Sequence, residues 1–160
     1  MTKILFVCYG NICRSPAAEF VMKDLVCKAG REKEFQIASA AVSSEEIWNG
    51  IGSPVYSQMK AELLANGIGT PENELGVSRK QARQMTREDY FAYDYLVGMD
   101  RGNLRDMRRI CGGDPEEKMS LLLDHTTTPG EVADPWYTRD FRQALEQIRS
   151  GCEGLLQELS

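Results

Sequence analysis

The sequence predicts an α/β fold, a doubly wound four-stranded parallel sheet with helices on both faces. Two observations lead to this prediction. Short apolar runs, of the kind that parallel sheets bury on both faces, alternate along the chain with longer segments of helical periodicity. Strands that alternate with helices in this way pair in parallel. We expect residues 1–160 to form one domain, because 160 residues can bury a full core and no repeat or linker divides them.

The first two predicted strands flank a helix. Ile4–Val7 is wholly apolar and predicts a short buried strand. Ser15 and Pro16 then predict a helix start, since a capping residue is followed by proline at the first helical position. Gly30 predicts the end of that helix. A second strand is expected over Phe35–Ser39.

The middle of the chain predicts two helices before the third strand. Ser53 and Pro54 predict the start of one helix, which ends at Gly67 and carries apolar residues on one face. A shorter helix is expected over Arg79–Met85, and the third strand over Asp94–Met99. This order continues the alternation of strands and helices.

The last part of the chain predicts a helix, the fourth strand and a long final helix. Asp100 is expected to cap a helix that stops before Gly112. Met119–Leu123 is the expected fourth strand. The final helix, from about Arg139 to the end, has the clearest helical period, set by Phe141, Leu145, Ile148, Cys152, Leu155 and Leu159.

The segment Cys8–Ser15 lies between the first strand and the first helix, at a strand end where such folds bind ligands. Unpaired backbone N–H groups and the helix dipole make a helix start suitable for a tetrahedral anion. Gly10 and Asn11 tolerate the left-handed backbone that a tight loop needs. Arg14 can hold two anion oxygens at once. The segment therefore predicts a phosphate-binding loop after the first strand.

Cys8 is expected to point its sulfur into this loop. A thiol at a helix N-terminus beside a cation has its pKa lowered from about 8.5 toward roughly 3.5–7.5. A thiolate that faces a bound phosphate is a nucleophile aimed at phosphorus, and Ser15 can donate a hydrogen bond to it. The alternative is an ordinary strand-to-helix turn with two buried thiols. The usual ATP-binding loop is absent, because the chain contains no G-x4-G-K-[ST] segment.

Phosphoryl transfer from an alcohol or phenol also needs an acid that protonates the leaving oxygen. Asp134 is the candidate, because it lies on a loop after the fourth strand and so at the same sheet edge. Pro135 stiffens this loop, and Trp136 and Tyr137 can form one side of a slot for an aromatic ring. The alternative is a plain turn, since aspartate and proline both favour turns.

Composition and charge exclude several classes of function. A net charge of −5 argues against nucleic acid as a partner. Five cysteines at irregular spacing make a poor disulfide framework and suggest a reducing compartment. We expect no metal site and no cofactor, because Cys8 and Cys13 have no second pair and the chain has one histidine, His125. The sequence predicts neither a signal peptide nor a membrane span, hence a cytoplasmic protein without a membrane partner; it gives no oligomeric state.

The motifs together resemble the low-molecular-weight protein tyrosine phosphatases. The resemblance runs nearly end to end, on CYGNICRSP at 8–16, MD at 99–100, NLR at 103–105 and DPWY at 134–137. It implies hydrolysis of phosphotyrosine in proteins or peptides through a phosphocysteine at Cys8, with Arg14 binding the phosphoryl oxygens. Asp134 would protonate the phenolate and then activate the water that frees phosphate. The resemblance also implies that the loop is braced by Asn11, Ser15 and Ser39.

Four residues bear on how far this resemblance extends. Cys13 matches a second loop cysteine that can form a reversible disulfide with the nucleophile. Lys80 stands where many relatives have histidine, which brings the bracing of Asn11 into question. Arg139 stands where a glycine often follows the acid loop. Trp48 is interpreted either as a further side of the slot or as a core aromatic.

Three other functions compete with phosphotyrosine hydrolysis. Protein arginine phosphatases of the same family tend to have threonine at the position of Ile12, whose apolar side chain instead favours an aryl ring. Arsenate reductases need a further pair of redox cysteines, whereas Cys111 and Cys152 are isolated in the sequence. A non-catalytic phosphotyrosine-binding module would not need both Cys8 and Asp134. The residues expected to contact substrate are Tyr9, Gly10, Asn11, Ile12, Cys13, Ser15, Trp48, Trp136 and Tyr137.

Overall fold

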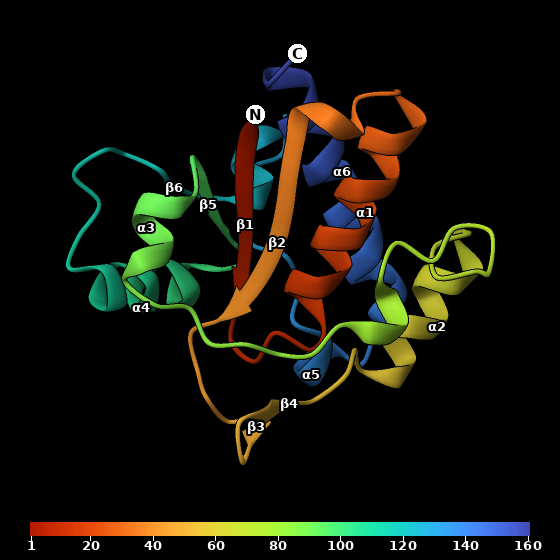
Figure 1. Cartoon of the computed structure of the whole chain (residues 1–160), viewed down its shortest axis with the longest axis horizontal. Coiled ribbons are helices and arrows are strands. Elements are labelled where there is room, and N and C mark those ends of the chain that lie inside the picture. The colour runs from red at the N-terminus through yellow and green to blue at the C-terminus, as the bar shows by residue number, and fades with distance from the viewer.

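A four-stranded parallel sheet forms the centre of the computed structural model, which describes residues 1–160 (Figure 1). Its strand order is β2-β1-β5-β6, and every pair is parallel. The strands span Thr2–Cys8 (β1), Phe35–Ala41 (β2), Tyr95–Gly98 (β5) and Met119–Leu121 (β6). The predicted fold class is therefore confirmed.

Helices cover both faces of this sheet. On one face lie α1 (Arg14–Lys28), α2 (Ser57–Ala65) and α6 (Phe141–Glu158), and on the other α3 (Glu88–Ala92) and α4 (Arg101–Cys111). The remaining short elements are the hairpin of β3 (Ile47–Trp48) and β4 (Ile51–Gly52), α5 (Pro135–Thr138), and three 3-10 turns at Glu32–Glu34, Val77–Arg79 and Leu122–His125. No helix has the length and apolar character that a membrane crossing would need.

The apolar run in β1 is explained by the two cores. Ile4 and Phe6 pack in the larger core, with residues of α1 and α6. Leu5 and Val7 point the other way, into the smaller core with residues of α3 and α4. Because both faces of the strand are buried, no position from 4 to 7 accommodates a polar side chain.

The helix predicted over Arg79–Met85 is wrong. Only the short turn Val77–Arg79 is helical, and the chain then runs extended beside the end of β2. Ala41 N donates to Arg83 O at 2.8 Å, and Met85 N donates to Ala41 O at 2.7 Å. The edge of the sheet thus offers these backbone groups partners that a helix would otherwise supply, which a local sequence pattern does not reveal.

Several predicted boundaries shift while the elements themselves are confirmed. The helix expected from Ser53 begins at Ser57, and the fourth strand ends at Leu121 because the next residues turn into a 3-10 helix. The capping role of Asp100 is confirmed, since its carboxylate accepts from Asn103 N at 2.8 Å. Ser15 does not cap α1, because the helix begins at Arg14.

Candidate active site

A cavity of about 530 Å³ opens beyond the carboxyl ends of β1 and β5. Three segments that are distant in sequence meet there: the loop after β1, the start of α4 and the start of α5. The lining residues are Cys8, Tyr9, Gly10, Ile12, Cys13, Arg14, Glu45, Glu46, Tyr56, Asp100, Gly102, Asn103, Arg105, Asp106, Asp134, Trp136, Tyr137 and Phe141. Parallel strands place their carboxyl ends at one edge, so the topology itself assembles this cavity.

The loop between β1 and α1 is tight at two positions, for different reasons. Asn11 takes the left-handed backbone with φ 59°, and its side chain is buried. Gly10 was expected to need the same conformation but does not adopt it. Space is limited there, since a Cβ on Gly10 would lie 3.3 Å from Glu46 Cγ. The loop therefore depends on asparagine for its turn and on glycine for its fit.

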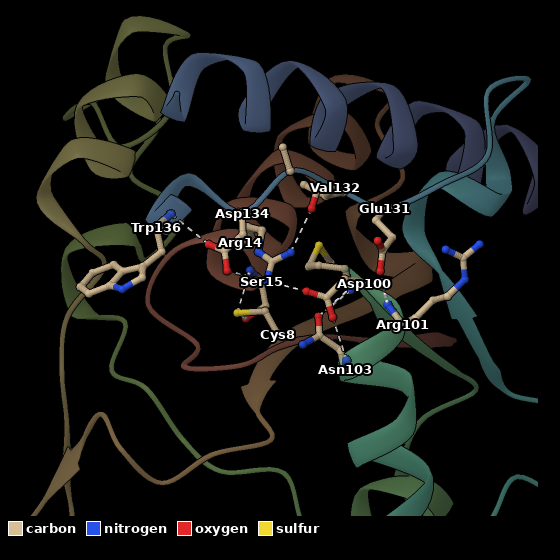
Figure 2. A network of polar contacts seen from close by, with 12 residues as sticks. Cys8, Arg14, Ser15, Asp100, Arg101, Asn103, Glu131, Val132, Asp134 and Trp136 are labelled. Carbon is tan, nitrogen blue, oxygen red and sulfur yellow. Dashed lines mark hydrogen bonds and ion pairs between the residues drawn. The ribbon is translucent and has the colours of Figure 1, made fainter. Parts of the chain in front are cut away.

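The sulfur of Cys8 lies at the end of β1, at the base of the loop (Figure 2). It is 3.0 Å from Ser15 Oγ, and Ser15 N donates to it at 3.4 Å from the first turn of α1. The sulfur therefore lies beside the first turn of α1, at the positive end of the helix dipole.

Arg14 is buried beside this sulfur and joined to two aspartates. Its guanidinium donates to Val132 O at 3.0 Å and to Asp100 Oδ2 at 2.9 Å, and it lies 3.5 Å from Asp134 Oδ2 (Figure 2). Burial alone lowers the pKa of Arg14, but the charges of Cys8, Asp134 and Asp100 outweigh it and raise the pKa above its ordinary value. A fixed cation thus lies beside the sulfur.

Asp134 caps α5 and lines the cavity, where its carboxylate lies near Arg14. Its Oδ1 accepts from Trp136 N at 3.0 Å, and Pro135 occupies the first helical position after it. The preceding segment is pinned to the fold, because Val132 N donates to Met99 O at 2.9 Å. The carboxylate is one-third exposed and so remains accessible to a bound ligand.

Aromatic side chains form much of the cavity lining. Tyr9, Trp136 and Tyr137 line it as expected from the sequence. Tyr56 and Phe141 also line it, although sequence reasoning missed both. Tyr56 stacks on Phe141 with ring centroids 5.6 Å apart and meets Trp136 edge to face at 6.3 Å. Their only signal was their position beside helix starts, which alone does not indicate a ligand.

Trp48 is neither a side of the slot nor a core aromatic, the two interpretations that the sequence offered. Its side chain is 71% exposed on the β3–β4 hairpin, so it is not a core aromatic. It does not line the cavity either, although its neighbours Glu45 and Glu46 do. The short hairpin turns Trp48 outward, a consequence of strand register that the sequence pattern did not reveal.

A buried hydrogen-bond network supports the loop from below. Asn11 Nδ2 donates to Ser15 Oγ at 2.8 Å and to Ser39 Oγ at 2.9 Å, and Asn11 Oδ1 accepts from Arg83 N at 3.1 Å. Lys80 joins this network, because its ammonium donates to Ser39 O at 3.2 Å. Lysine at this position therefore maintains contact with the network around Asn11.

Two further residues of interest lie in or near the cavity. Cys13 lines it, and burial first, then the charge of Cys8, raise the pKa of its thiol to about 12. Arg139 ends α5 in the left-handed conformation with φ 61°, and its guanidinium lies 5.8 Å from the centre of the Trp136 ring. The positive φ explains why glycine suits this position. No cluster of three His, Cys, Asp or Glu side chains is placed to hold a metal ion.

Comparison with known proteins shows that this fold and cavity belong to a class of phosphatases. Residues 3–160 match the family model described as low molecular weight phosphotyrosine protein phosphatase, and the chain belongs to that family, whose members are hydrolases.

Comparison with individual proteins agrees with this assignment. The chain is similar to the low molecular weight protein-tyrosine-phosphatase YfkJ of Bacillus subtilis, with 34% identity over 98% of this chain and 94% of the relative. The human low molecular weight phosphotyrosine protein phosphatase is also 34% identical, over 97% of this chain and 94% of that relative.

Two solved structures illustrate the similarity in fold. The crystal structure of YfkJ has a TM-score of 0.87 at 33% identity, covering 99% of this chain and 94% of that one. The crystal structure of a Drosophila arginine phosphatase has a TM-score of 0.83 at 25% identity, covering 99% of this chain and 98% of that one. The same fold thus serves phosphatases that differ in substrate.

Proposed function

We propose that this protein hydrolyses phosphotyrosine in proteins or peptides through a phosphocysteine intermediate. The observation that carries the proposal is the convergence of Cys8, Arg14 and Asp134, from three separate segments, on one aromatic-lined cavity. A nucleophile, a cation and an acid are the groups that transfer from a phosphate ester requires.

In the first step, the Cys8 thiolate attacks phosphorus and forms an S–P bond while the P–O bond to the tyrosine ring breaks. Asp134 gives its proton to the departing phenolate, so neutral tyrosine leaves. Arg14 and the loop N–H groups bind the phosphoryl oxygens, on which negative charge is spread in the transition state. The aspartates that hold Arg14 fix the plane of its guanidinium for this task.

In the second step, Asp134 takes a proton from water, whose oxygen attacks phosphorus. The new P–O bond forms as the S–P bond breaks, which releases phosphate and returns Cys8 as a thiolate. Ser15 donates to the sulfur at 3.0 Å and stabilises it as a leaving group. Asp134 gives one proton to the phenolate and takes one from water, so it is protonated again after each cycle.

The cavity lining favours an aryl substrate. Ile12 and the rings of Tyr9, Tyr56 and Trp136 offer apolar and edge contacts, each aromatic pair contributing about 0.5–1.5 kcal/mol. The phosphate of phosphoserine lies close to its backbone, so that the peptide would meet the rim before its phosphorus reached Cys8.

A protein arginine phosphatase is the second candidate, supported by the similarity to the Drosophila arginine phosphatase. The carboxylates of Glu45 and Glu46 also line the cavity, and a guanidinium would complement them. Ile12 argues against this candidate, because it supplies no hydroxyl for a polar substrate. We therefore rank phosphotyrosine first.

Arsenate reduction and non-catalytic binding have less support. Cys111 lies in the smaller core and Cys152 in the larger one, on opposite faces of the sheet, so they cannot form a redox pair without unfolding. Burial raises the pKa of Cys152 far above its usual range. A binding module would not need Cys8 and Asp134 together, whereas both are retained here.

Three peptides of one sequence, bearing phosphotyrosine, phosphoserine or phosphoarginine, test the substrate class. We expect kcat/KM for phosphotyrosine to exceed that for phosphoserine by at least about 100-fold. Phosphoserine lacks the aryl ring, so its transition state loses the contacts that the cavity lining makes with that ring. Release of inorganic phosphate is the measurement. Faster turnover of phosphoarginine would replace this proposal by the second candidate, and turnover of none would favour the binding module.

We further propose that residues 1–160 work as one domain in a reducing compartment such as the cytoplasm, where Cys8 and Cys13 form a reversible disulfide under peroxide. Hydrogen peroxide would oxidise the Cys8 thiolate to a sulfenic acid, and Cys13 would displace water from it to form the S–S bond. Oxidation removes the Cys8 charge that helps raise the pKa of Cys13, so the second thiol ionises more readily at that moment.

Oxidation and rescue test the role of Cys13. We expect wild-type protein that hydrogen peroxide has inactivated to regain most of its activity in dithiothreitol. Cys13→Ser should regain little, because its sulfenic acid proceeds to irreversible products. Cys27→Ser, at an exposed thiol, is the matched control. Equal recovery of wild type and Cys13→Ser would contradict the disulfide.

A further inference from the structure

We propose that the solvent face of α4 binds acidic residues that flank the phosphotyrosine of a substrate. Four arginines form this face, Arg101, Arg105, Arg108 and Arg109, and together we call them the arginine stripe. The substrates inferred here, which rest on the proposed function, are peptides with several acidic residues on one side of the phosphotyrosine.

The helical period of α4 explains why these arginines lie together. Leu104, Met107 and Cys111 belong to the smaller core and recur at the spacing of one helix face. Positions 101, 105 and 108 are also three or four residues apart, so they are neighbours on the helix surface, and position 109 adjoins them. All four arginines are exposed, so packing in the core does not account for them.

Few carboxylates neutralise the stripe. Asp106 Oδ1 lies 3.7 Å from Arg105 Nε and 3.6 Å from Arg109 Nη2, so two guanidinium groups share one carboxylate beyond hydrogen-bond distance. Every ion pair of the stripe ends on this aspartate. Glu131 Oε2 instead accepts from the backbone N of Arg101, at 2.7 Å. The stripe therefore retains positive charge for a ligand.

Asp114 interacts with the charge of Arg108 but is held by other donors. Its carboxylate accepts from Tyr90 Oη at 2.8 Å, from Lys118 N at 2.8 Å and from Met119 N at 3.0 Å. These hydrogen bonds keep the carboxylate in the loop after α4. The exposed guanidinium of Arg108 thus remains open to a ligand.

The stripe is continuous with the cavity. Arg105 lines the cavity together with Gly102 and Asn103 from the first turns of α4. A helix rises about 1.5 Å per residue, so positions 108 and 109 lie about 4.5 and 6 Å farther along the axis. Figure 2 shows the Arg101 side chain leading away from Cys8. Because an extended peptide advances about 3.3 Å per residue, residues about two to four positions from the phosphotyrosine reach the stripe.

A second segment of the lining has the opposite charge. Glu45 and Glu46, between β2 and β3, also line the cavity. Glu45 Oε1 accepts from Tyr9 Oη at 2.8 Å, which holds its carboxylate beside the cavity. An acidic residue over this segment would be repelled, whereas the same residue over α4 would be attracted. Acidic residues should therefore favour binding on one side of the phosphotyrosine only.

The charge of the whole chain makes this local attraction necessary. With a net charge of −5, the protein as a whole repels an acidic peptide. Four of its 19 lysines and arginines nevertheless lie within residues 101–109. The Debye length is about 10 Å at 0.1 M salt, so these charges act on a bound peptide while distant carboxylates are largely screened.

Three phosphotyrosine peptides of equal length test the arginine stripe. One has glutamine on both sides of the phosphotyrosine, and the others have glutamate instead either before or after it. We expect one acidic peptide to exceed the neutral peptide in kcat/KM by about fivefold at low salt, since each exposed ion pair contributes little. This preference should disappear near 1 M salt, where the Debye length is about 3 Å.

Charge reversal at the far end of the stripe identifies the surface involved. The double variant Arg108→Glu, Arg109→Glu should make the preferred acidic peptide a poorer substrate than the neutral one. Neither residue lines the cavity, so turnover of a small aryl phosphate should be unchanged. Arg142→Glu is the matched control, because Arg142 is an exposed helical arginine that lies 3.5 Å from Glu146 in α6, on the other face of the sheet.

Arg108→Gln with Arg109→Gln provides a second variant should charge reversal at the helix end prevent folding. It should abolish the preference without reversing it. Equal kcat/KM for all three peptides, or an equal gain from glutamate on either side, would overturn the proposal. So would a loss in the folded double variant that is the same for neutral and acidic peptides.

Binding separates this inference from the proposed function. Calorimetry with Cys8→Ser measures the affinity for each peptide without turnover. If wild type hydrolyses no peptide, but the acidic peptide binds more tightly than the neutral one and the double variant loses that difference, the arginine stripe is supported and the proposed function is rejected. Hydrolysis of all three phosphotyrosine peptides at one rate would keep the proposed function and reject the stripe.

Discussion

Replacing Cys8 with serine is expected to abolish phosphotyrosine hydrolysis, with a loss in kcat of at least about 10⁴-fold. A serine hydroxyl stays protonated where a thiol ionises, and its neighbour at 3.0 Å, Ser15, is a hydroxyl that offers no base. The exchange removes little volume, so the loop should still bind phosphate.

The measurement is phosphate release from a phosphotyrosine peptide, with binding of inorganic phosphate followed in parallel by calorimetry. Retained binding with lost turnover would show that Cys8 acts in the chemical step, and that the loop and Arg14 bind the phosphate without it. Cys27→Ser serves as control, because that thiol is exposed and outside the cavity. Comparable activity in Cys8→Ser and wild type would reject the phosphocysteine route.

The sheet could be predicted from the sequence because the residues of β1 and those that follow it point to one local structure. An apolar run followed by a loop and a proline-containing helix start has few other structural solutions, and parallel pairing then brings the ends of β1, β5 and β6 to one edge. The meeting of Cys8 and Asp134 could be inferred for this reason, although they are 126 positions apart in the printed sequence. Topology provided the proximity, and residue type provided the chemistry.

The sequence was less informative where tertiary contacts override local pattern. The segment after Val77–Arg79 resembles a helix until its backbone pairs with the end of β2. The contacts of Arg14 with Asp100 and Val132 also depend on the fold, because each partner comes from a different loop. Tyr56 was missed as a lining residue because its place beside the cavity, where it stacks on Phe141, depends on the fold and not on the local sequence.

Lys80 illustrates a departure from the family pattern that the structure resolves. From the sequence, a lysine near Asn11 brought the bracing network into question. In the fold its ammonium satisfies Ser39 O and faces Glu19, and no buried polar side-chain atom is left without a partner. Burial lowers the pKa of Lys80, and the charge of Glu19 opposes that shift, so the lysine is placed beside a carbonyl and a carboxylate that favour its charged form.

Asp134→Asn is expected to reduce kcat/KM for phosphotyrosine peptides by about 10²–10⁴-fold, the range associated with loss of a general acid. The variant should fold normally, because asparagine caps a helix as well as aspartate does and can still accept from Trp136 N. Only the proton and the negative charge are removed. The effect therefore reports on chemistry rather than on the α5 loop.

The leaving group separates this role from simple electrostatics. Tyrosine is a weak acid with a pKa of about 10, so its phenolate needs a proton as it departs. An aryl phosphate with a much more acidic phenol leaves unaided, and the loss in Asp134→Asn should shrink to a few-fold. We would compare kcat/KM across a series of aryl phosphates in wild type and variant. A steeper dependence on phenol acidity in the variant identifies Asp134 as the proton donor, whereas a uniform loss across the series would assign it instead to holding Arg14 in place.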